Sequence, residues 1–280
     1  FESGKRSLRL QATPISVASS LRERLFSEPR ALVFTSATLC AEGSGAHFRK
    51  SIGLDDAEVR IWHSPYDYEG RSLLYVPEGM PEPGSDAFAP TMVSRIAPVL
   101  RASSGRAFVL FTSYRVMRQV HELMEEMDEF PLLLQGEAPK QQLVERFRQT
   151  DGGVLLGTTS FWEGVDVKGD DLVCVIIDKL PFSSPFDPVN RARLRHIETE
   201  GGNAFSEYLL PRAVLALKQG AGRLIRDEGD YGVLMICDPR IIDRGYGRAF
   251  LEALPPMRRT RREDLVIRFF NYFKAQGRSA

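Results

Sequence analysis

The sequence predicts an α/β protein built on a parallel sheet with helices on both faces. Short apolar runs alternate along the chain with segments of helical periodicity, which is typical of parallel strands joined by crossover helices. The 280 residues, 43 % hydrophobic and 26 % charged, are enough to bury a sizeable core in one large domain or two smaller ones. This composition excludes disordered and fibrous proteins.

Apolar runs predict the strands of the sheet, and helical periodicity predicts the helices between them. Five core strands are expected at 106–112, 132–134, 154–156, 172–177 and 232–237, with a further edge strand at 73–76. Helices are expected at 114–127, 141–148, 188–199 and 205–226. In the first of these helices, Val116, Val120, Leu123 and Met127 form one apolar stripe.

The first 65 residues follow a different pattern. An amphipathic helix is expected over 15–26, and a buried strand over 31–35. After them, the stretch 77–90 is rich in Pro, Gly and Glu, which is typical of a surface loop.

A polar and aromatic loop from Gly157 to Asp166, with the sequence GTTSFWEGVD, separates two of the expected strands. Hydroxyl groups, backbone N–H groups near glycines and two carboxylates in one loop suit phosphate contacts and metal-linked nucleotide handling. The alternative for the two acids is ordinary capping of a helix or loop.

A second informative run, from Gln219 to Arg226 with the sequence QGAGRLIR, precedes the last core strand. At ~100° per residue, Gln219, Arg223 and Arg226 would lie on one face of a helix. The opposite face would hold Leu210, Val214, Leu217, Ala221 and Leu224. Gly220 and Gly222 would each cost ~1 kcal/mol relative to Ala inside a helix, and such violations tend to mark functional sites. The alternative is a buried helix with a solvated basic edge.

Together these two segments resemble motifs of the second RecA-like domain of superfamily 2 helicases, in the DinG and XPD branch and of the DinG/YoaA type. SFWEGVD is similar to the fifth motif of that family, and QGAGRLIR to the sixth, the arginine-finger motif. Three further segments match in the expected order. TSATL at 35–39 resembles the third motif, FTSY at 111–114 the fourth, and DKLPF at 178–182 the loop after a strand. The resemblance extends from about Leu32 to Pro239.

The resemblance implies a RecA-like sheet without its own Walker A loop, serving as the C-terminal motor domain of an ATP-dependent DNA helicase. Residues 1–65 would be a remnant of the first helicase domain and a linker, and residues 66–280 the second RecA-like domain. ATP and Mg²⁺ would be bound mainly by the first domain. This chain alone is therefore expected not to hydrolyse ATP.

The same resemblance assigns roles to individual residues. Arg223, Arg226 and Gln219 are expected to be catalytic, because arginines can stabilise charge on a transferred phosphate and Gln219 can orient them or contact the phosphate or its water. The expected ATP-binding residues are Glu163, Gly164, Asp166 and Gly222.

The implied substrate is single-stranded DNA, moved in the 5′-to-3′ direction during DNA repair or replication. The expected DNA-binding residues are Thr112, Ser113, Tyr114, Thr158, Thr159, Ser160, Phe161 and Trp162. Their hydroxyls would contact phosphates, and their aromatic rings would stack on bases. The alternative for aromatic residues in such loops is to plug the protein core. The first RecA-like domain of the same protein is the expected protein partner, and the chain is expected to be a monomer.

Cys40, Cys174 and Cys237 are far apart in sequence and lie in or beside apolar runs, which predicts reduced core thiols and a cytoplasmic protein. No set of four cysteines and no metal-like spacing of histidines occurs, so neither zinc nor an iron–sulfur cluster is expected in this chain. The resemblance allows a cluster in the first domain of the full-length protein. The sequence contains no apolar stretch of about 18 residues, so no membrane-spanning helix is expected.

Lys and Arg total 37, as do Asp and Glu, so any nucleic-acid contact must come from a local patch. Three alternatives remain open. One is a RecA-like nucleic-acid-binding module without ATPase activity. Another is a Rossmann-type enzyme, which the lack of a GxGxxG sequence disfavours. The third is a motor that acts on RNA or is coupled to a nuclease.

Overall fold

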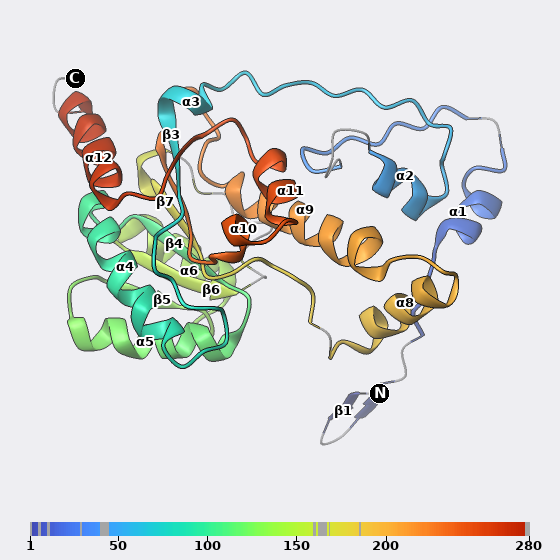
Figure 1. Ribbon diagram of the computed structural model, residues 1–280, viewed down its shortest axis with the longest axis horizontal. Coiled ribbons are helices and arrows are strands. Elements are labelled where there is room, and N and C mark those ends of the chain that lie inside the picture. Colours follow the sequence, from blue (N-terminus) through green and yellow to red (C-terminus); the bar gives the residue numbers. More distant parts are fainter. Residues whose placement is uncertain are drawn as a thin grey trace. The chain divides into compact units, whose positions relative to one another are not determined.

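The computed structural model describes residues 2–4, 7–9, 12–28, 30–39, 45–158, 161, 167, 169–184 and 186–277 (Figure 1). The chain divides into two compact units. The smaller unit comprises residues 1–61 and 182–215, and the larger unit comprises residues 62–181 and 216–280. The predicted sheet belongs to the larger unit.

The larger unit is built on a seven-stranded parallel sheet with the spatial order β5-β6-β4-β7-β8-β3-β9. Its strands are β3 (Ser72–Tyr75), β4 (Ala107–Phe111), β5 (Leu132–Leu134), β6 (Val154–Thr158), β7 (Cys174–Ile177), β8 (Gly232–Ile236) and β9 (Arg258–Thr260). All five predicted core strands are present, so the predicted α/β fold with a parallel sheet is confirmed.

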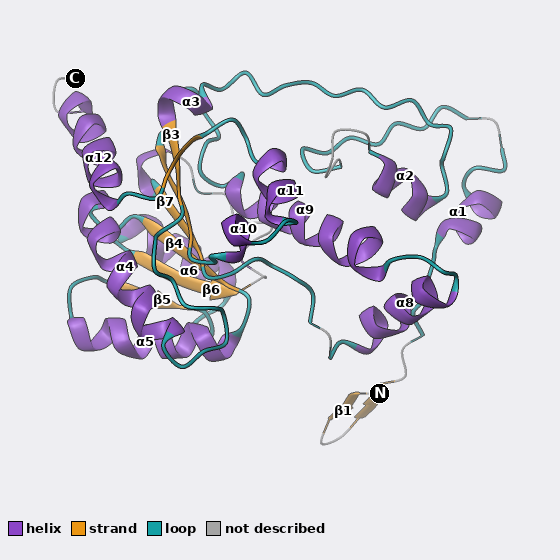
Figure 2. Ribbon diagram, in the orientation of Figure 1, coloured by secondary structure: helices purple, strands orange, loops and turns teal. Residues whose placement is uncertain are grey.

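Helices cover both faces of this sheet (Figure 2). The described helices that lie wholly within this unit are α3 (Tyr68–Arg71), α4 (Phe88–Ser103), α5 (Tyr114–Met127), α6 (Lys140–Gln149), α10 (Arg240–Asp243), α11 (Gly247–Ala253) and α12 (Glu263–Gly277), together with a short 3₁₀ turn, η1 (Gly169–Asp171). Helices α4, α5 and α12 share one buried cluster with alternate strand residues such as Val109 and Met235. From the other face, Phe147 of α6 packs on Phe108 of β4, with ring centroids 4.7 Å apart. This two-sided packing follows from the alternation of side chains along each strand.

The predicted edge strand at 73–76 corresponds to β3, but the edge assignment is wrong. β3 pairs with β8 on one side and with β9 on the other. β9 carries Arg258 and Arg259 within three residues, so it has no apolar run that could reveal it in the sequence. Charged side chains are common on edge strands, because they prevent pairing with a further strand.

The smaller unit joins two distant segments of the chain. It contains an antiparallel pair, β1 (Glu2–Gly4) with β2 (Ser7–Arg9), and the helices α1 (Ala18–Arg24), α2 (Ala46–Ile52) and α8 (Pro188–Thr199). A π-helical turn, η2 (Phe205–Leu209), leads into α9 (Leu210–Ala221). Lys50 Nζ lies 2.8 Å from Glu207 Oε2, and Arg193 Nε donates a hydrogen bond of 3.1 Å to the Ile15 carbonyl. These contacts connect the two segments.

The predicted buried strand at 31–35 is wrong. These residues belong to no strand, and Val33 is 85 % exposed. An extended apolar segment forms a strand only where a neighbour satisfies its backbone groups, and none of the strands that the structure describes pairs with this segment. The interpretation of residues 1–65 as a remnant of a first helicase domain stays a prediction.

Candidate functional site

Several predicted polar residues lie at the carboxyl edge of the sheet. Because the strands are parallel, their carboxyl ends meet at one edge, which is where open α/β sheets bind ligands. Thr112 follows β4, Thr158 ends β6, and Asp178 follows β7. Phe111 and Thr158 are in register between β4 and β6. The carboxyl-edge cluster consists of Thr112, Ser113, Tyr114, Gln135, Thr158 and Asp178.

Asp178 is completely buried in this cluster. Its carboxylate accepts hydrogen bonds from the backbone N–H of Thr112 at 3.0 Å, from the Thr112 hydroxyl at 3.4 Å and from the backbone N–H of Lys179 at 2.7 Å. Burial raises the pKa of Asp178 to about 7, because desolvation of the charged form outweighs these hydrogen bonds and the nearby Lys179 charge. Asp178 therefore ties the ends of β4 and β7 together with a carboxyl group that titrates near neutral pH.

A second buried carboxylate, Asp238, organises the neighbouring strand end. It accepts a hydrogen bond of 2.8 Å from the backbone N–H of Leu180, and it pairs with Arg240, whose Nη2 lies 2.7 Å from Asp238 Oδ2. The hydrogen bond to Asp238 raises the pKa of the Arg240 guanidinium. Reasoning from the sequence missed this pair, although its acid stands directly after an apolar run and its base two residues later.

Ser113 and Tyr114 begin helix α5. Ser113 Oγ accepts a hydrogen bond of 3.4 Å from the backbone N–H of Val116 and so caps the helix. Tyr114 is 55 % exposed. The ring is therefore accessible at the carboxyl edge of the sheet, and the DNA-binding role of Tyr114 stays a prediction.

Thr158 lies at the carboxyl edge, at the end of β6, but its side chain is turned inward. It is 4 % exposed, and its hydroxyl donates a hydrogen bond of 3.0 Å to Gln135 Oε1. The predicted direct phosphate contact of this hydroxyl is therefore wrong for the structure described, because the hydroxyl is buried and already donates its hydrogen bond to Gln135. The structure adds Gln135, which the sequence analysis did not single out. Only its position directly after the short strand at 132–134 could have indicated it.

Phe161 is also buried, at 1 % exposure, and Lys140 Nζ lies 5.5 Å from the centroid of its ring. A ring in this environment cannot stack on a base, so the prediction of a stacking role for Phe161 is wrong here. The alternative of a core plug describes it correctly. Its position is explained by Gly157, because the ring packs directly against that glycine.

Substituting Gly157 with Ala tests this packing. A methyl group at position 157 would lie 2.9 Å from two ring carbons of Phe161, closer than side chains normally approach. We expect a loss of about 1 to 3 kcal/mol in the free energy of unfolding, measured by urea denaturation. Gly229→Ala is the matched control, because a methyl group there would meet nothing within 4 Å. Equal stability of the two variants would contradict this packing.

The run from Gln219 to Arg226 does not form one continuous helix as predicted, because α9 ends at Ala221. Beyond it, Arg223 N bonds to the Gly220 carbonyl and Leu224 N to the Ala221 carbonyl, each at 3.2 Å. These tighter bonds end the helix where two glycines weaken it. Arg223 and Arg226 therefore do not share a helical face with Gln219. The predicted apolar side is confirmed in its main part, because Val214, Leu217, Ala221 and Leu224 are all buried.

The segment after α9 is held by one nearby residue, Asp230, and by one distant residue, Tyr66. The backbone N–H groups of Arg226 and Asp227 both donate to Asp230 Oδ2, at 2.7 and 2.9 Å. The Arg226 carbonyl accepts a hydrogen bond of 2.6 Å from the Tyr66 hydroxyl. Asp230 is 7 % exposed, whereas the side chains of Arg223 and Arg226 are half-buried. The backbone at Arg226 is thus fixed on both sides by residues that the sequence analysis did not select.

Six predicted site residues lie outside the described residues. They are Thr159, Ser160, Trp162, Glu163, Gly164 and Asp166. Gln219 lies in the last turns of α9, and Gly222 is exposed directly after it. The roles predicted for these residues stay predictions.

Among the residues that the structure describes, no group of three or more His, Cys, Asp and Glu side chains could hold a metal ion. Cys174 and Cys237 are buried free thiols, as expected from their apolar surroundings, and Cys40 lies outside the described residues. In the described part of the chain, every helix is too short or too polar to span a membrane.

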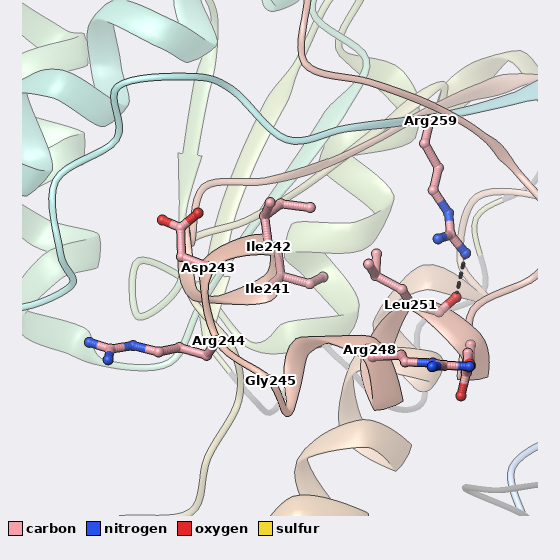
Figure 3. A pocket seen from close by; sticks show the side chains of 9 residues that line it. Ile241, Ile242, Asp243, Arg244, Gly245, Arg248, Leu251 and Arg259 are labelled. Atoms are coloured by element: carbon pink, nitrogen blue, oxygen red, sulfur yellow. Dashed lines mark hydrogen bonds and ion pairs between the residues drawn. The ribbon is translucent and has the colours of Figure 1, made fainter.

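A surface hollow of about 500 Å³ lies beside α10 and α11 (Figure 3). It is lined by Ile241, Ile242, Asp243, Arg244, Gly245, Arg248, Leu251, Glu252 and Arg259. Its arginines are engaged within the protein. Arg244 pairs with Glu82 and Arg248 with Glu252, and Arg259 Nη2 donates 2.7 Å to the Leu251 carbonyl. None of the residues predicted from the sequence lines this hollow, so it is separate from the carboxyl-edge cluster.

Comparison with protein families gives one match over more than half of the chain. The model described as helicase C-terminal domain matches residues 96–257. Two solved XPD structures are similar in fold. An XPD helicase aligns with a TM-score of 0.60 at 17 % identity, covering 80 % of this chain and 41 % of that one. The Xpd4 protein of S. tokodaii aligns with a TM-score of 0.51 at 17 % identity, covering 69 % and 39 %. The predicted RecA-like fold is thereby confirmed.

Curated relatives extend the similarity over nearly the whole chain. The ATP-dependent DNA helicase YoaA of Escherichia coli (strain K12) is 44 % identical over 269 residues, which are 96 % of this chain and 42 % of that protein. The 3′-5′ exonuclease DinG of Bacillus subtilis (strain 168) is 36 % identical, covering 90 % and 28 %. The ATP-dependent helicase DinG of Mycobacterium tuberculosis (strain ATCC 25618 / H37Rv) is 37 % identical, covering 90 % and 38 %. The chain thus spans less than half the length of these relatives.

Proposed function

We propose that this chain, which belongs to the helicase C-terminal domain family, is the second motor domain of an ATP-dependent DNA helicase. Its relatives are DinG and YoaA proteins, and its fold is that of XPD helicases. The observation that carries the proposal is the segment after α9, in which Asp230 and Tyr66 fix the backbone of Arg226 inside the matched domain. An anchored backbone reduces the entropy lost when an arginine reaches into a nucleotide site.

In the proposed reaction, ATP lies on the first RecA-like domain, and the second domain completes the site when the cleft closes. Arg223 and Arg226 act as arginine fingers that stabilise charge on the transferred phosphate. Gln219 orients them or contacts the phosphate or its water. Glu163, Gly164, Asp166 and Gly222 contribute nucleotide contacts. Mg²⁺ would accompany ATP and be held mainly by the first domain.

Single-stranded DNA crosses the carboxyl edge of the sheet in this proposal. Tyr114 supplies an exposed ring on which a base can stack, and Thr112 and Ser113 lie beside it. Thr159, Ser160 and Trp162 would add contacts from the loop after β6. Repeated closing and opening of the cleft would move the strand in the 5′-to-3′ direction. We place this activity in the cytoplasm, in DNA repair or replication, with the protein acting as a monomer.

Two alternatives are separated by experiment. One is a nucleic-acid-binding module without ATP chemistry. The other is a motor that acts on RNA or is joined to a nuclease, and the exonuclease name of the Bacillus subtilis relative is the observation that favours testing it.

The test uses the intact protein with ATP, Mg²⁺ and labelled oligonucleotides. We expect single-stranded DNA to stimulate ATP hydrolysis more than RNA of the same sequence, and duplexes with a 5′ tail to be unwound in preference to those with a 3′ tail. Absence of hydrolysis with either nucleic acid would overturn the motor assignment. Stronger stimulation by RNA, or shortening of the labelled strand without ATP, would support the second alternative.

A further inference from the structure

Gln135 makes a two-sided contact that connects β6 with the exposed Tyr114. Its Oε1 accepts hydrogen bonds from Thr158 N at 2.6 Å and from Thr158 Oγ1 at 3.0 Å. Its Nε2 donates a hydrogen bond of 2.7 Å to the Tyr114 hydroxyl. The backbone of Gln135 is fixed as well, because its N–H donates 2.9 Å to the Leu156 carbonyl.

The direction of the hydrogen bond between Gln135 and Tyr114 follows from the partner on the other side. A backbone N–H can only donate, so the amide atom that faces Thr158 N must be the oxygen. The amide nitrogen must then face Tyr114, and a nitrogen of this kind only donates. The Tyr114 hydroxyl is therefore an acceptor toward Gln135, and its own proton remains for another acceptor.

The remaining proton of Tyr114 has no acceptor among the residues that the structure describes, and the side chain is 55 % exposed. A phenol that accepts one hydrogen bond becomes a better donor, because chains of hydrogen bonds polarise one another. A phosphate oxygen is an acceptor that suits such a donor, and a charged acceptor gives the stronger hydrogen bond. The ring of the same residue offers a flat apolar face.

We infer that Gln135 is a positioning residue that holds the Tyr114 hydroxyl as a directed hydrogen-bond donor to a phosphate of single-stranded nucleic acid. The inference rests on the proposed function and adds to it a donor role for Tyr114 and a role for Gln135. Gln135 acts through Tyr114 and does not touch the nucleic acid itself. The amide oxygen of Gln135 is bonded to Thr158 at the end of β6. The position of the Tyr114 hydroxyl, which the amide nitrogen contacts, therefore depends on the end of this strand.

The test measures binding of a fluorescent oligothymidylate of about 20 nucleotides to the intact protein by anisotropy. Tyr114→Phe keeps the ring and removes the proton, and we expect about tenfold weaker binding, the magnitude for one hydrogen bond to a charged group. Tyr114→Ala also removes the stacking surface, and we expect binding weaker by about a further tenfold.

Gln135→Glu is the decisive variant, because it preserves size and reverses one hydrogen bond. A carboxylate still accepts hydrogen bonds from both Thr158 groups, but toward Tyr114 it can also only accept. The Tyr114 hydroxyl would then donate its hydrogen bond to this carboxylate and no longer to a phosphate. We expect binding weaker by about tenfold, as for Tyr114→Phe. Gln135→Leu would leave both Thr158 donors without this acceptor and destabilise the edge, so Gln135→Glu is the variant used for the test.

A double-mutant cycle separates donor reversal from simple charge repulsion. In the Tyr114→Phe background no proton remains to be taken, so Gln135→Glu should have no further effect. The control is Gln142→Glu, which adds the same charge at an exposed position of α6 and should leave binding unchanged. A further loss in the Tyr114→Phe background would show repulsion and overturn the inference. Wild-type binding by Gln135→Glu would overturn it too.

Failure of this inference and failure of the proposed function give different results. If Tyr114→Ala weakens binding and Tyr114→Phe does not, the ring lies on the nucleic-acid path and only the donor role is overturned. If the wild-type protein neither binds the oligonucleotide nor hydrolyses ATP in its presence, the proposed function itself fails.

Discussion

Alanine substitution of Arg226 or Arg223 is expected to lower DNA-stimulated ATP hydrolysis by about 10³-fold or more, while leaving the fold intact. The expectation follows from the proposed role of both residues, because an arginine finger stabilises charge that develops only as the phosphate is transferred. A lysine cannot replace the planar, forked guanidinium, so Arg226→Lys should lose most of the activity as well. Turnover of the intact protein at saturating ATP and DNA, with thermal unfolding measured in parallel, checks the prediction.

Arg244→Ala is the matched control for these arginine variants. Arg244 lies in the same unit, and its guanidinium forms an exposed ion pair of 2.8 Å with Glu82. Exposed pairs contribute about 0 to 1 kcal/mol, so this variant should keep normal turnover and stability. Turnover within tenfold of wild type for both Arg223→Ala and Arg226→Ala would contradict the assignment of arginine fingers. A large fall in the unfolding temperature would instead make the two residues structural.

The backbone around these arginines shows where sequence periodicity stops being informative. Spacing alone placed Gln219, Arg223 and Arg226 on one helical face, because periodicity assumes that the helix continues. The helix ends at Ala221, since two glycines weaken it and Asp230 takes up the freed backbone N–H groups. The stripe of Val214, Leu217 and Ala221 was predictable because burial on one face repeats with the helical period.

Strands were predicted well wherever they are apolar on both faces. β4, β6, β7 and β8 are buried along their whole length, and a continuous apolar run reveals such a strand. β9 was missed because it contains two arginines and no apolar run. A charged strand of this kind is typical of a sheet edge, and the edge position is known only once the sheet is assembled. The segment at 31–35 is the opposite case, because its apolar run predicted burial that no described neighbour provides.

The carboxyl-edge cluster was predictable in position but not in chemistry. Parallel strands bring their carboxyl ends to one edge, so Thr112 after β4, Thr158 at the end of β6 and Asp178 after β7 lie near one another. Local sequence cannot show which hydroxyls already donate their hydrogen bond to an acceptor inside the protein. Thr158 is occupied by Gln135 and Thr112 by Asp178, and both acceptors lie more than twenty residues away. Long-range hydrogen bonds of this kind require the folded structure.

The second large expected effect is a pH dependence of stability caused by Asp178. Its carboxyl group has a higher pKa in the folded protein than in the unfolded chain. Its pKa is raised to about 7 by burial, from an ordinary value of 3.8. Between about pH 4 and pH 7 the folded protein therefore holds a proton that the unfolded chain has released. The free energy of unfolding gains most from this group below pH 4, falls as the pH rises toward 7, and changes no further above that.

Asp178→Asn should remove this pH dependence. The amide oxygen can still accept from Thr112 N and Lys179 N, and the amide nitrogen can donate to the Thr112 hydroxyl, so the edge should stay assembled. Relative to the variant, we expect wild-type protein to lose about 2 to 4 kcal/mol of unfolding free energy between pH 4 and pH 8. Urea denaturation at several pH values, followed by circular dichroism, measures the difference.

Asp171→Asn provides the control, since it removes an exposed carboxylate from η1 in the same unit without touching the buried edge. The free energy of unfolding of Asp171→Asn should differ from that of wild type by a constant amount at every pH. That of Asp178→Asn should increase relative to wild type as the pH rises. A constant difference between wild type and Asp178→Asn from pH 4 to pH 8 would mean that Asp178 stays ionised when folded. The hydrogen bonds from Thr112 and Lys179 would then outweigh burial, and the coupling of β4 to β7 would be independent of pH.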